Sequence, residues 1–167
     1  RGWSGPGPEQ CKGKVESYMD YCYGTKIESF RYRNKRWQKY LTAPRSCEGQ
    51  VTIEKFSESM RQEFYIDKDG MIASVYCRGK VLDLERANCD STDSPKIILY
   101  DKKYEDTSNQ KWIFWNSKNE KGAGGMFINK KCKGEPNPIV MAESHNNVIG
   151  YQIKVDGDND WQIWQAV

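Results

Sequence analysis

The sequence predicts an all-β fold in which one structural unit occurs three times. From about residue 27 onward, short runs of apolar, β-branched and aromatic residues alternate with turn residues, a pattern typical of strands. An amide followed two residues later by an aromatic ring recurs at intervals of 48 and 49 residues. Aromatic residues are 13% of the chain and hydrophobic residues only 37%, which indicates a core built on a few large rings.

Along the chain, the expected elements are an extension followed by a series of strands. Residues 1–26 are rich in Gly, Pro and Cys and show little periodicity, so we predict an amino-terminal extension outside the core. No later stretch has the spacing of an amphipathic helix of three turns. The apolar runs predict strands at 51–56, 63–66, 81–84, 97–100, 112–115, 126–128, 139–142, 153–155 and 161–164.

The repeats are defined by the segments RQEF (61–64), NQKW (109–112) and DNDW (158–161), whose amides are Gln62, Gln110 and Asn159. The segments KYL, KVL and GMF open the units at 39, 80 and 125, and VTIEKF, KIILY and PIVMA supply the next strand of each. We therefore predict a domain over 27–167 made of three units of roughly 45 residues, at about 27–69, 70–118 and 119–167.

The central unit, GKVLDLERANCDSTDSPKIILYDKKYEDTSNQKW at 79–112, resembles a repeat of the ricin-type (R-type) β-trefoil lectins. Repeats of that family have a strand bearing Leu-Asp, an apolar strand that ends in an aromatic residue, and an Asn-Gln-x-Trp signature. The match is close over this unit and recognisably threefold from about 27 to 164. The resemblance implies a β-trefoil that binds galactose- or N-acetylgalactosamine-type glycans on glycoproteins or glycolipids, without catalysis and without a cofactor.

Carried over by this resemblance, the sugar site consists of Asp83, Tyr100, Asn109 and Gln110. A carboxylate accepts hydrogen bonds from two neighbouring sugar hydroxyls, and a flat ring packs under the C–H face of the sugar. An asparagine side chain can both donate to and accept from a hydroxyl. Simpler roles compete with these: Gln110 can brace the repeat, Tyr100 can be a packing ring, and Asp83 can be a solvated strand carboxylate.

The other two units lack this set, so we expect a single working site. In the first unit, Thr42 stands for the Asp, Phe56 for the ring and Arg61 for the Asn. A monomer with one site cannot cross-link cells, so agglutination would require a homodimer or a second kind of site. In the third unit, the corresponding positions are assigned to Ile128 or Asn129, to Met141 or Ala142, and to Asp158-Asn159.

Composition excludes several other functions. The single histidine, His145, rules out an HExxH metal site and makes a Ser-His triad improbable, so we expect neither an enzyme nor a metal site. The formal net charge of only +3, with both signs mixed, argues against nucleic acid as a partner. The basic and aromatic residues at 31–40 could bind a sulfated glycan or nucleic acid, but a first strand with alternating faces is favoured. No apolar stretch reaches the length of a transmembrane helix.

The cysteines indicate a secreted, disulfide-linked protein. Their number is even, none form a CxxC pair, and a chain that starts at Arg1 fits a mature protein whose signal peptide has been removed. If Cys47, Cys89 and Cys132 are equivalent in the three units, they lie too far apart to bond to one another. Six pairings with the remaining cysteines are then open. We predict Cys77–Cys89, with Cys11 and Cys22 fastening the extension to repeats one and three.

A second hypothesis of a different class remains open. The sugar site could be vestigial, in which case the β-trefoil would act through protein contacts, as protease inhibitors and cytokine-like trefoils do. A targeting module of a larger hydrolase or toxin is a third hypothesis.

Overall fold

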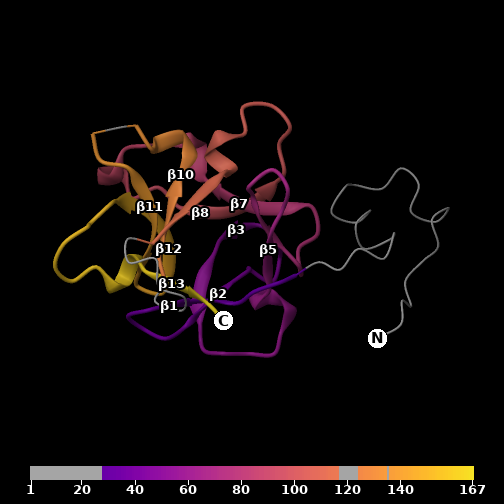
Figure 1. Ribbon diagram of the computed structural model, residues 1–167. Helices are drawn as coiled ribbons and strands as arrows, with labels where there is room; N and C mark the ends of the chain where they lie inside the picture. The colour runs from indigo at the N-terminus through magenta and orange to yellow at the C-terminus, as the bar shows by residue number, and fades with distance from the viewer. Residues whose placement is uncertain (1–27, 117–123, 135) are drawn as a thin grey trace.

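The computed structural model describes residues 28–116, 124–134 and 136–167 (Figure 1). Strands account for its regular structure, and the helices in this part of the chain are single turns of 3-10 helix. The strands are β1 (Tyr32–Asn34), β2 (Tyr40–Thr42), β3 (Gly49–Gln50), β4 (Thr52–Glu54), β5 (Phe64–Ile66), β6 (Ile72–Ser74), β7 (Lys80–Leu84), β8 (Ile97–Asp101), β9 (Trp112–Trp115), β10 (Met126–Asn129), β11 (Ile139–Ser144), β12 (Asn147–Gln152) and β13 (Trp164–Ala166). The short helices are η2 (Met60–Gln62), η3 (Glu85–Ala87), η4 (Ser91–Asp93), η5 (Ser108–Gln110), η6 (Lys130–Cys132) and η7 (Asp160–Gln162).

The strands form two antiparallel sheets. The larger has the order β13-β1-β2-β4-β12-β11-β10-β9, and the smaller has the order β3-β8-β7-β6-β5. The carboxyl-terminal strand β13 pairs with β1, so the two ends of the described domain lie side by side at one edge of the larger sheet. The all-β prediction is confirmed.

Threefold equivalence is visible in the strand pairing. Each unit contributes four equivalent strands: β1, β2, β4 and β5, then β6 to β9, then β10 to β13; the first unit also contains the two-residue strand β3. The central hairpin of each unit pairs its second and third strands in the same way. Equivalent pairs are Leu41↔Ile53, Leu82↔Leu99 and Met141↔Gly150. The exact boundaries given for the repeats stay a prediction.

A buried glutamine braces each unit at the end of a 3-10 turn. The Nε2 group of Gln62 donates to the carbonyl of Lys55 at 2.8 Å, and its Oε1 accepts from the backbone N–H of Ser57 at 2.8 Å. Gln110 and Gln162 make the same pair of backbone contacts, each within 2.9 Å, to the segments after β8 and β12. Each glutamine thereby satisfies backbone groups where a strand ends, and such groups are costly to leave unpaired.

The third unit departs from the predicted register. Its brace is Gln162, whereas Asn159, to which the sequence pattern assigned this role, makes an exposed contact to the carbonyl of Lys154. The chain between β12 and η7 is longer than its counterpart in the first unit, and Trp161 produces a false match three residues before the true one. The predicted opening segments are also not equivalent. GMF overlaps β10, the first strand of its unit, whereas KYL and KVL overlap β2 and β7, the second strands of theirs.

The core is filled by large side chains at equivalent positions. Phe64, Trp112 and Trp164 each follow a bracing glutamine by two residues and are buried. The indole Nε1 of Trp112 donates to the carbonyl of Leu82 at 3.1 Å, and that of Trp164 donates to the carbonyl of Met141 at 3.0 Å. These contacts satisfy the polar end of each indole inside an apolar cluster.

Strand β12 replaces the strand expected at 153–155. It runs over Asn147–Gln152 and pairs with β11 along its whole length. The sequence pattern missed it because Gly150 interrupts its short apolar run and polar residues, Asn147 and Gln152, stand at its two ends. Within the hairpin, Gly150 lies so close to Leu84 that a Cβ at this position would come within 2.8 Å of the leucine side chain.

The disulfide prediction is wrong. Cys47 is bonded to Cys77, and Cys89 is bonded to Cys132, so the bond expected between Cys77 and Cys89 does not form. The error comes from the register: Cys132 follows the first strand of its unit, as Cys77 does, and is therefore not equivalent to Cys89. Both expected partners for the extension, Cys47 and Cys132, are taken. Cys11 and Cys22 themselves lie outside the described residues.

Candidate functional site

The hairpin of β7 and β8 places two of the four predicted site residues on one face. Asp83 pairs with Ile98, and Val81 pairs with Tyr100. Because paired residues share a face and alternate residues return to it, Asp83 and Tyr100 are diagonal neighbours on the same side of the sheet. The turn η5 then brings Asn109 and Gln110 against this hairpin.

Gln110 holds the Asp83 carboxylate in place. Its Nε2 group donates to Asp83 Oδ2 at 2.9 Å and to the carbonyl of Asp101 at 2.9 Å, while its Oε1 accepts from the backbone N–H of Lys103 at 2.9 Å. The side chain is fully buried and both of its N–H groups are engaged. Gln110 is therefore placed to orient the carboxylate rather than to bind a ligand directly.

Asp83 itself is a buried acid whose negative charge is only partly stabilised by neighbouring groups. The residue is 4% exposed. Burial raises the pKa of its carboxyl above the ordinary value of 3.8, and this effect outweighs the hydrogen bond from Gln110 and the nearby positive charge of Lys103, which favour the ionised form. An ionised carboxylate offers about four acceptor positions, so it keeps acceptor capacity beyond the hydrogen bonds from Gln110 and Asn109.

Asn109 is fixed on three sides. Its Nδ2 group donates to the carbonyl of Leu84 at 3.1 Å, and its Oδ1 accepts from Lys103 Nζ at 2.7 Å. Its own backbone carbonyl accepts from Asn129 Nδ2 at 3.0 Å, a bond that links the second unit to β10. A hydrogen bond from Asn109 also favours the ionised form of Asp83. The amide and the carboxylate thus form one preorganised polar cluster.

Tyr100 provides an accessible ring beside this cluster. It lies near the end of β8 and is 51% exposed, so the structure does not place it in the core as a packing ring. Its position on the same face as Asp83 gives the site one polar wall and one aromatic wall. The structure therefore brings Asp83, Asn109 and Gln110 into one buried polar cluster and places the exposed Tyr100 on the same face of the hairpin.

Lys103 is a member of this cluster that the sequence pattern did not single out. It follows β8 by two residues, and its Nζ contacts Asn109. The neighbouring Lys102 anchors the segment: its Nζ lies 3.0 Å from Asp67 Oδ2 and 2.7 Å from Asp69 Oδ2. Although burial alone would lower the pKa of Lys102, the two carboxylates raise it, so this lysine stays charged.

The equivalent positions in the other units carry no such cluster. Gln62 donates to Thr42 Oγ1 at 3.2 Å, so Thr42 occupies the place of Asp83, as expected. Arg61, which precedes Gln62, stands in the place of Asn109, as expected. The register of the hairpins corrects the remaining assignments. In the first unit, Glu54 rather than Phe56 matches Tyr100.

In the third unit, the carboxylate position is held by Ala142 rather than by Ile128 or Asn129, and the ring position by Tyr151 rather than by Met141 or Ala142. The position of Asn109 is held by Trp161, which precedes Gln162, rather than by a residue of the pair Asp158-Asn159.

Among residues 28–116, 124–134 and 136–167, no group of three or more His, Cys, Asp or Glu side chains is arranged to hold a metal ion. No helix in the same part of the chain has the length and apolar character needed to cross a membrane.

Comparison with known proteins identifies the fold. A designed threefold-symmetric protein, ThreeFoil, superposes with a TM-score of 0.67 at 20% identity, over 83% of this chain and 97% of that one. A lectin from Polyporus squamosus bound to Neu5Acα2-6Galβ1-4GlcNAc gives 0.66 at 17% identity, over 84% and 48%. A non-toxic homologue of type II ribosome-inactivating proteins from Momordica charantia, in complex with α-methyl-D-galactoside, gives 0.63 at 16% identity, over 85% and 48%.

These likenesses confirm the β-trefoil fold that the sequence resemblance implied. No protein-family model matches the chain, and no curated protein sequence matches it. The chain spans about half the length of the Polyporus and Momordica proteins. Some other chains of the same fold belong to larger proteins with an activity of their own, including an endo-β-galactosidase from Clostridium perfringens, of which this chain covers 33%.

Proposed function

We propose that this protein is a secreted carbohydrate-binding lectin that recognises galactose- or N-acetylgalactosamine-type glycans through one site in its second repeat. The observation that carries the proposal is the hydrogen bond from Gln110 to Asp83, which holds a buried carboxylate beside the exposed ring of Tyr100. The equivalent positions Thr42 and Ala142 offer no carboxylate.

The geometry suits a sugar that presents hydroxyls on one edge and C–H groups on one face. Asp83 would accept two hydroxyl hydrogen bonds, and Asn109 and Lys103 would contact a neighbouring hydroxyl. The ring of Tyr100 would pack against the C–H face. Such a shallow, prebuilt site is expected to bind a monosaccharide with a dissociation constant between about 1 mM and 1 μM, or roughly −4 to −8 kcal/mol.

Two comparisons support the choice of sugar. The Momordica protein is in complex with a galactoside, and the Polyporus lectin is bound to a sialylated galactose-containing epitope. Disulfides such as Cys47–Cys77 and Cys89–Cys132 persist in oxidising compartments, which supports secretion. The expected partners are glycoproteins or glycolipids, and agglutination through this site would require a homodimer or another site.

Calorimetric titration with methyl β-galactoside tests the proposal. The variant Asp83→Asn keeps an acceptor for Gln110 but removes the charge, so we expect at least a tenfold loss of affinity with little change in unfolding temperature. Thr42→Ala, at the equivalent position of the first unit, is the matched control and should bind as the unchanged protein does. Failure of the unchanged protein to bind galactosides at millimolar concentration, or full affinity in Asp83→Asn, would contradict the proposal.

A further inference from the structure

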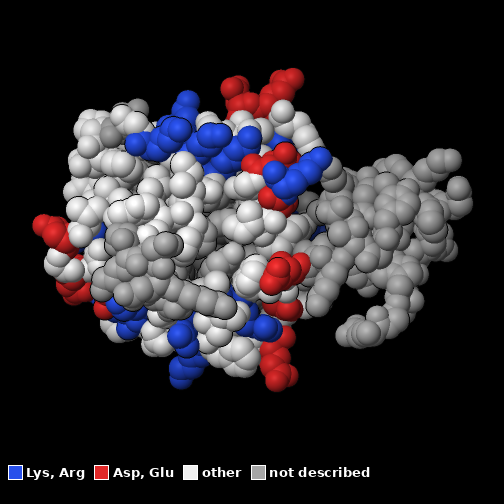
Figure 2. Space-filling view, viewed as in Figure 1, with Lys and Arg blue, Asp and Glu red and all other residues white. Residues whose placement is uncertain are grey.

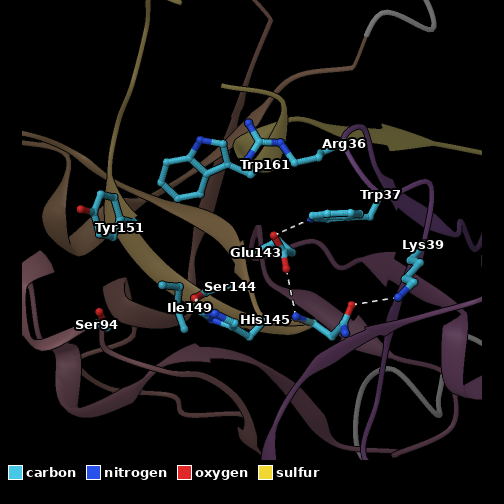
Figure 3. A pocket seen from close by; sticks show the side chains of 11 residues that line it. Arg36, Trp37, Lys39, Ser94, Glu143, Ser144, His145, Ile149, Tyr151 and Trp161 are labelled. Atoms are coloured by element: carbon cyan, nitrogen blue, oxygen red, sulfur yellow. Dashed lines mark hydrogen bonds between the residues drawn. The ribbon is translucent and has the colours of Figure 1, made fainter. Parts of the chain in front are cut away.

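The three junctions between units are closed in two different ways. Cys77 and Cys132 each lie three residues after the first strand of a unit, and each is bonded to a cysteine that follows the second strand of the preceding unit. In the first unit, the residue at this position is Trp37. Its indole Nε1 donates instead to Glu143 Oε1 at 2.8 Å, beside a cavity of about 550 Å³ at the junction with the third unit (Figure 3). Because Trp37, Cys77 and Cys132 are equivalent, the turns after the three first strands can be compared residue by residue.

A two-stranded ribbon also joins each unit to the next, and the three ribbons differ in their exposed side chains. The last strand of one unit pairs with the first strand of the next, as β5–β6, β9–β10 and β13–β1. In β9, the three residues after the buried Trp112 are apolar, and each is at least 40% exposed: Ile113, Phe114 and Trp115. The equivalent residues of the other two ribbons are Tyr65, Ile66 and Asp67, and Gln165, Ala166 and Val167. Of the three, β9 alone therefore presents three exposed apolar side chains in succession.

Side chains on both faces of β9 are accessible. Phe114 pairs with Phe127, and the two rings pack edge to face with centroids 5.0 Å apart. Because successive residues of a strand point to opposite faces, Ile113 and Trp115 lie on the other side of the ribbon. The larger sheet ends at β9, so no described strand pairs with its outer edge. Ile113, Phe114 and Trp115 thus form an apolar ridge, which we call the β9 ridge, rather than the lining of a groove.

Lysine side chains lie where the β9 ridge begins. The carbonyl of Lys111 accepts from the backbone N–H of Lys130 at 2.9 Å, so these two lysines face each other across the ribbon. Lys111 has an extended backbone and precedes Ile113 by two residues, which places it on the same face as Ile113 and Trp115. Two further lysines follow Lys130 in and just after the turn η6, namely Lys131 and Lys133.

The positive charge of these four lysines is not neutralised by the described chain. No carboxylate among residues 28–116, 124–134 and 136–167 forms an ion pair with any of them, and all but Lys111 are exposed. The carboxylate of Asp69 senses the charge of Lys111 more weakly than that of Lys102, with which it is paired at 2.7 Å. In Figure 2, Lys and Arg side chains gather near the top of the view, above the place where Figure 1 labels β10.

The first unit has basic residues at the same positions of its turn, but their charge is paired. Lys35 and Arg36 are equivalent to residues 130 and 131. Lys35 Nζ lies 3.4 Å from Asp160 Oδ1, and Arg36 Nη2 lies 2.6 Å from Asp158 Oδ1. The turn η6 thus leaves available to an external anion the charges that the first unit pairs internally.

An apolar ridge bordered by unpaired lysines matches the surface of an anionic membrane. Tryptophan and other large apolar side chains are favoured at the boundary between headgroups and acyl chains, at a depth of about 5–10 Å. Lysines near the surface are attracted by the negative charge of anionic lipids. Along an extended strand, Lys111 and Trp115 are roughly 13 Å apart, so the lysines can reach lipid phosphates while the far end of the ridge is inserted. A protein partner would have to supply a matching groove, whereas lipids rearrange around an inserted side chain.

We propose that the β9 ridge and the four lysines form a docking surface for membranes that contain anionic phospholipids. Ile113, Phe114 and Trp115 insert among the headgroups, and the lysines contact the lipid phosphates. Both features are needed, because a small apolar insertion and a basic patch are each too weak for stable attachment. The surface requires no sugar, so the proposal does not depend on galactoside binding at Asp83.

Co-sedimentation of the full chain with sugar-free vesicles tests the proposal. Vesicles of phosphatidylcholine alone are compared with vesicles that also contain about 30 mol% phosphatidylserine. We expect saturable binding to the anionic vesicles, at least tenfold weaker binding to the neutral ones, and loss of most binding at about 0.5 M salt. Brominated lipids should quench part of the tryptophan emission of the bound protein. Trp115→Phe, which keeps an apolar ring, should remove this quenching and retain binding.

A double variant tests the contribution of charge. Lys130→Gln combined with Lys131→Gln should weaken binding to the anionic vesicles by about tenfold or more. Its matched control is Lys35→Gln combined with Arg36→Gln, at the equivalent positions of the first unit, which should leave binding unchanged. All four side chains are exposed, so we expect both variants to unfold at nearly the temperature of the unchanged protein.

A second double variant tests the apolar contribution. Ile113→Ser combined with Trp115→Ser should weaken binding to the anionic vesicles by at least tenfold. The matched control is Val167→Ser, an exposed apolar residue at the position of Trp115 in the third unit, and it should bind as the unchanged protein does.

The proposal is overturned by absence of binding to the anionic vesicles at low salt, by equal binding to neutral and anionic vesicles, or by double variants that bind as their controls do. A dimer in solution that Ile113→Ser combined with Trp115→Ser dissociates would also contradict it. In that case the β9 ridge would be an interface between two copies of the chain.

Discussion

The carboxyl group of Asp83 experiences opposing influences on its pKa. Burial raises the pKa, whereas the hydrogen bond from Gln110 and the charge of Lys103 lower it, and the net result lies above the ordinary value of 3.8. Sugar hydroxyls need the ionised form as an acceptor. The same burial that fixes the carboxylate geometry therefore makes its function sensitive to mild acid.

Galactoside binding should consequently be lost as pH falls, beginning above pH 3.8. Because the folded protein binds this proton more readily than the unfolded chain, the contribution of Asp83 to folding stability increases as pH falls through the same range. Loss of affinity should therefore precede any loss of structure. Calorimetric titrations between pH 7 and pH 4, with circular dichroism at each pH, check this. Constant affinity down to pH 3.8 would show that the ionised carboxylate is not the acceptor.

The glutamine–aromatic turn is the element that shapes each unit. Gln62, Gln110 and Gln162 are all buried and connect the end of one strand to the start of the next. A side chain amide can do this because it offers both a donor and an acceptor on one planar group. In all three units the turn holds the backbone in place. Only in the second unit does its glutamine also contact an acidic side chain, Asp83, and only there do we propose a sugar site.

Replacement of the third brace tests this role. Gln162→Ala leaves the backbone N–H of Lys154 and the carbonyl of Gln152 without their partners, so we expect a loss of about 2 to 4 kcal/mol of unfolding free energy. Asn159→Ala removes only an exposed contact and should cost less than about 1 kcal/mol. Urea unfolding of the two variants measures both values. Equal losses would mean that the brace has been assigned to the wrong residue.

Sequence reasoning was most successful where the unit carries its full pattern. In the second unit, Asp83, Tyr100 and Asn109-Gln110 have the spacing of the resembling family, and the structure brings them together. In the third unit, the segment WQIW contains Gln162 and Trp164, but Trp161 supplies a competing match at a more regular interval. A longer connection after β12 is absorbed outside the core, and spacing alone does not reveal such an insertion.

The residue pairs that connect different units could not be predicted from the sequence. The bonds Cys47–Cys77 and Cys89–Cys132 span 30 and 43 residues and depend on which strand each cysteine follows. An error of one strand in the third unit made Cys89 and Cys132 seem equivalent, and equivalent positions would be too distant to bond. The contact of Trp37 with Glu143, 106 residues away, has no local sequence signal.

Viewed as one molecule, the β-trefoil combines repeated architecture with unequal junctions and unequal sites. Two junctions are covalently closed, and the third is closed by Trp37 and Glu143 beside a cavity. The polar cluster around Asp83 is confined to the second unit. Each unit thus has the bracing glutamine and the buried aromatic residue that the fold needs. The side chains that could contact a ligand differ from one unit to the next.

The location of galactoside binding is the most direct test of the central claim. Two-dimensional ¹H–¹⁵N NMR during titration with methyl β-galactoside reports which backbone amides sense the ligand. The predicted result is saturable shifts at 83–85, 100–103 and 109–110, with little change at the equivalent positions 42, 54, 61, 142, 151 and 161. Shifts confined to the first or third unit, or no shifts at millimolar ligand, would contradict a sugar site at Asp83.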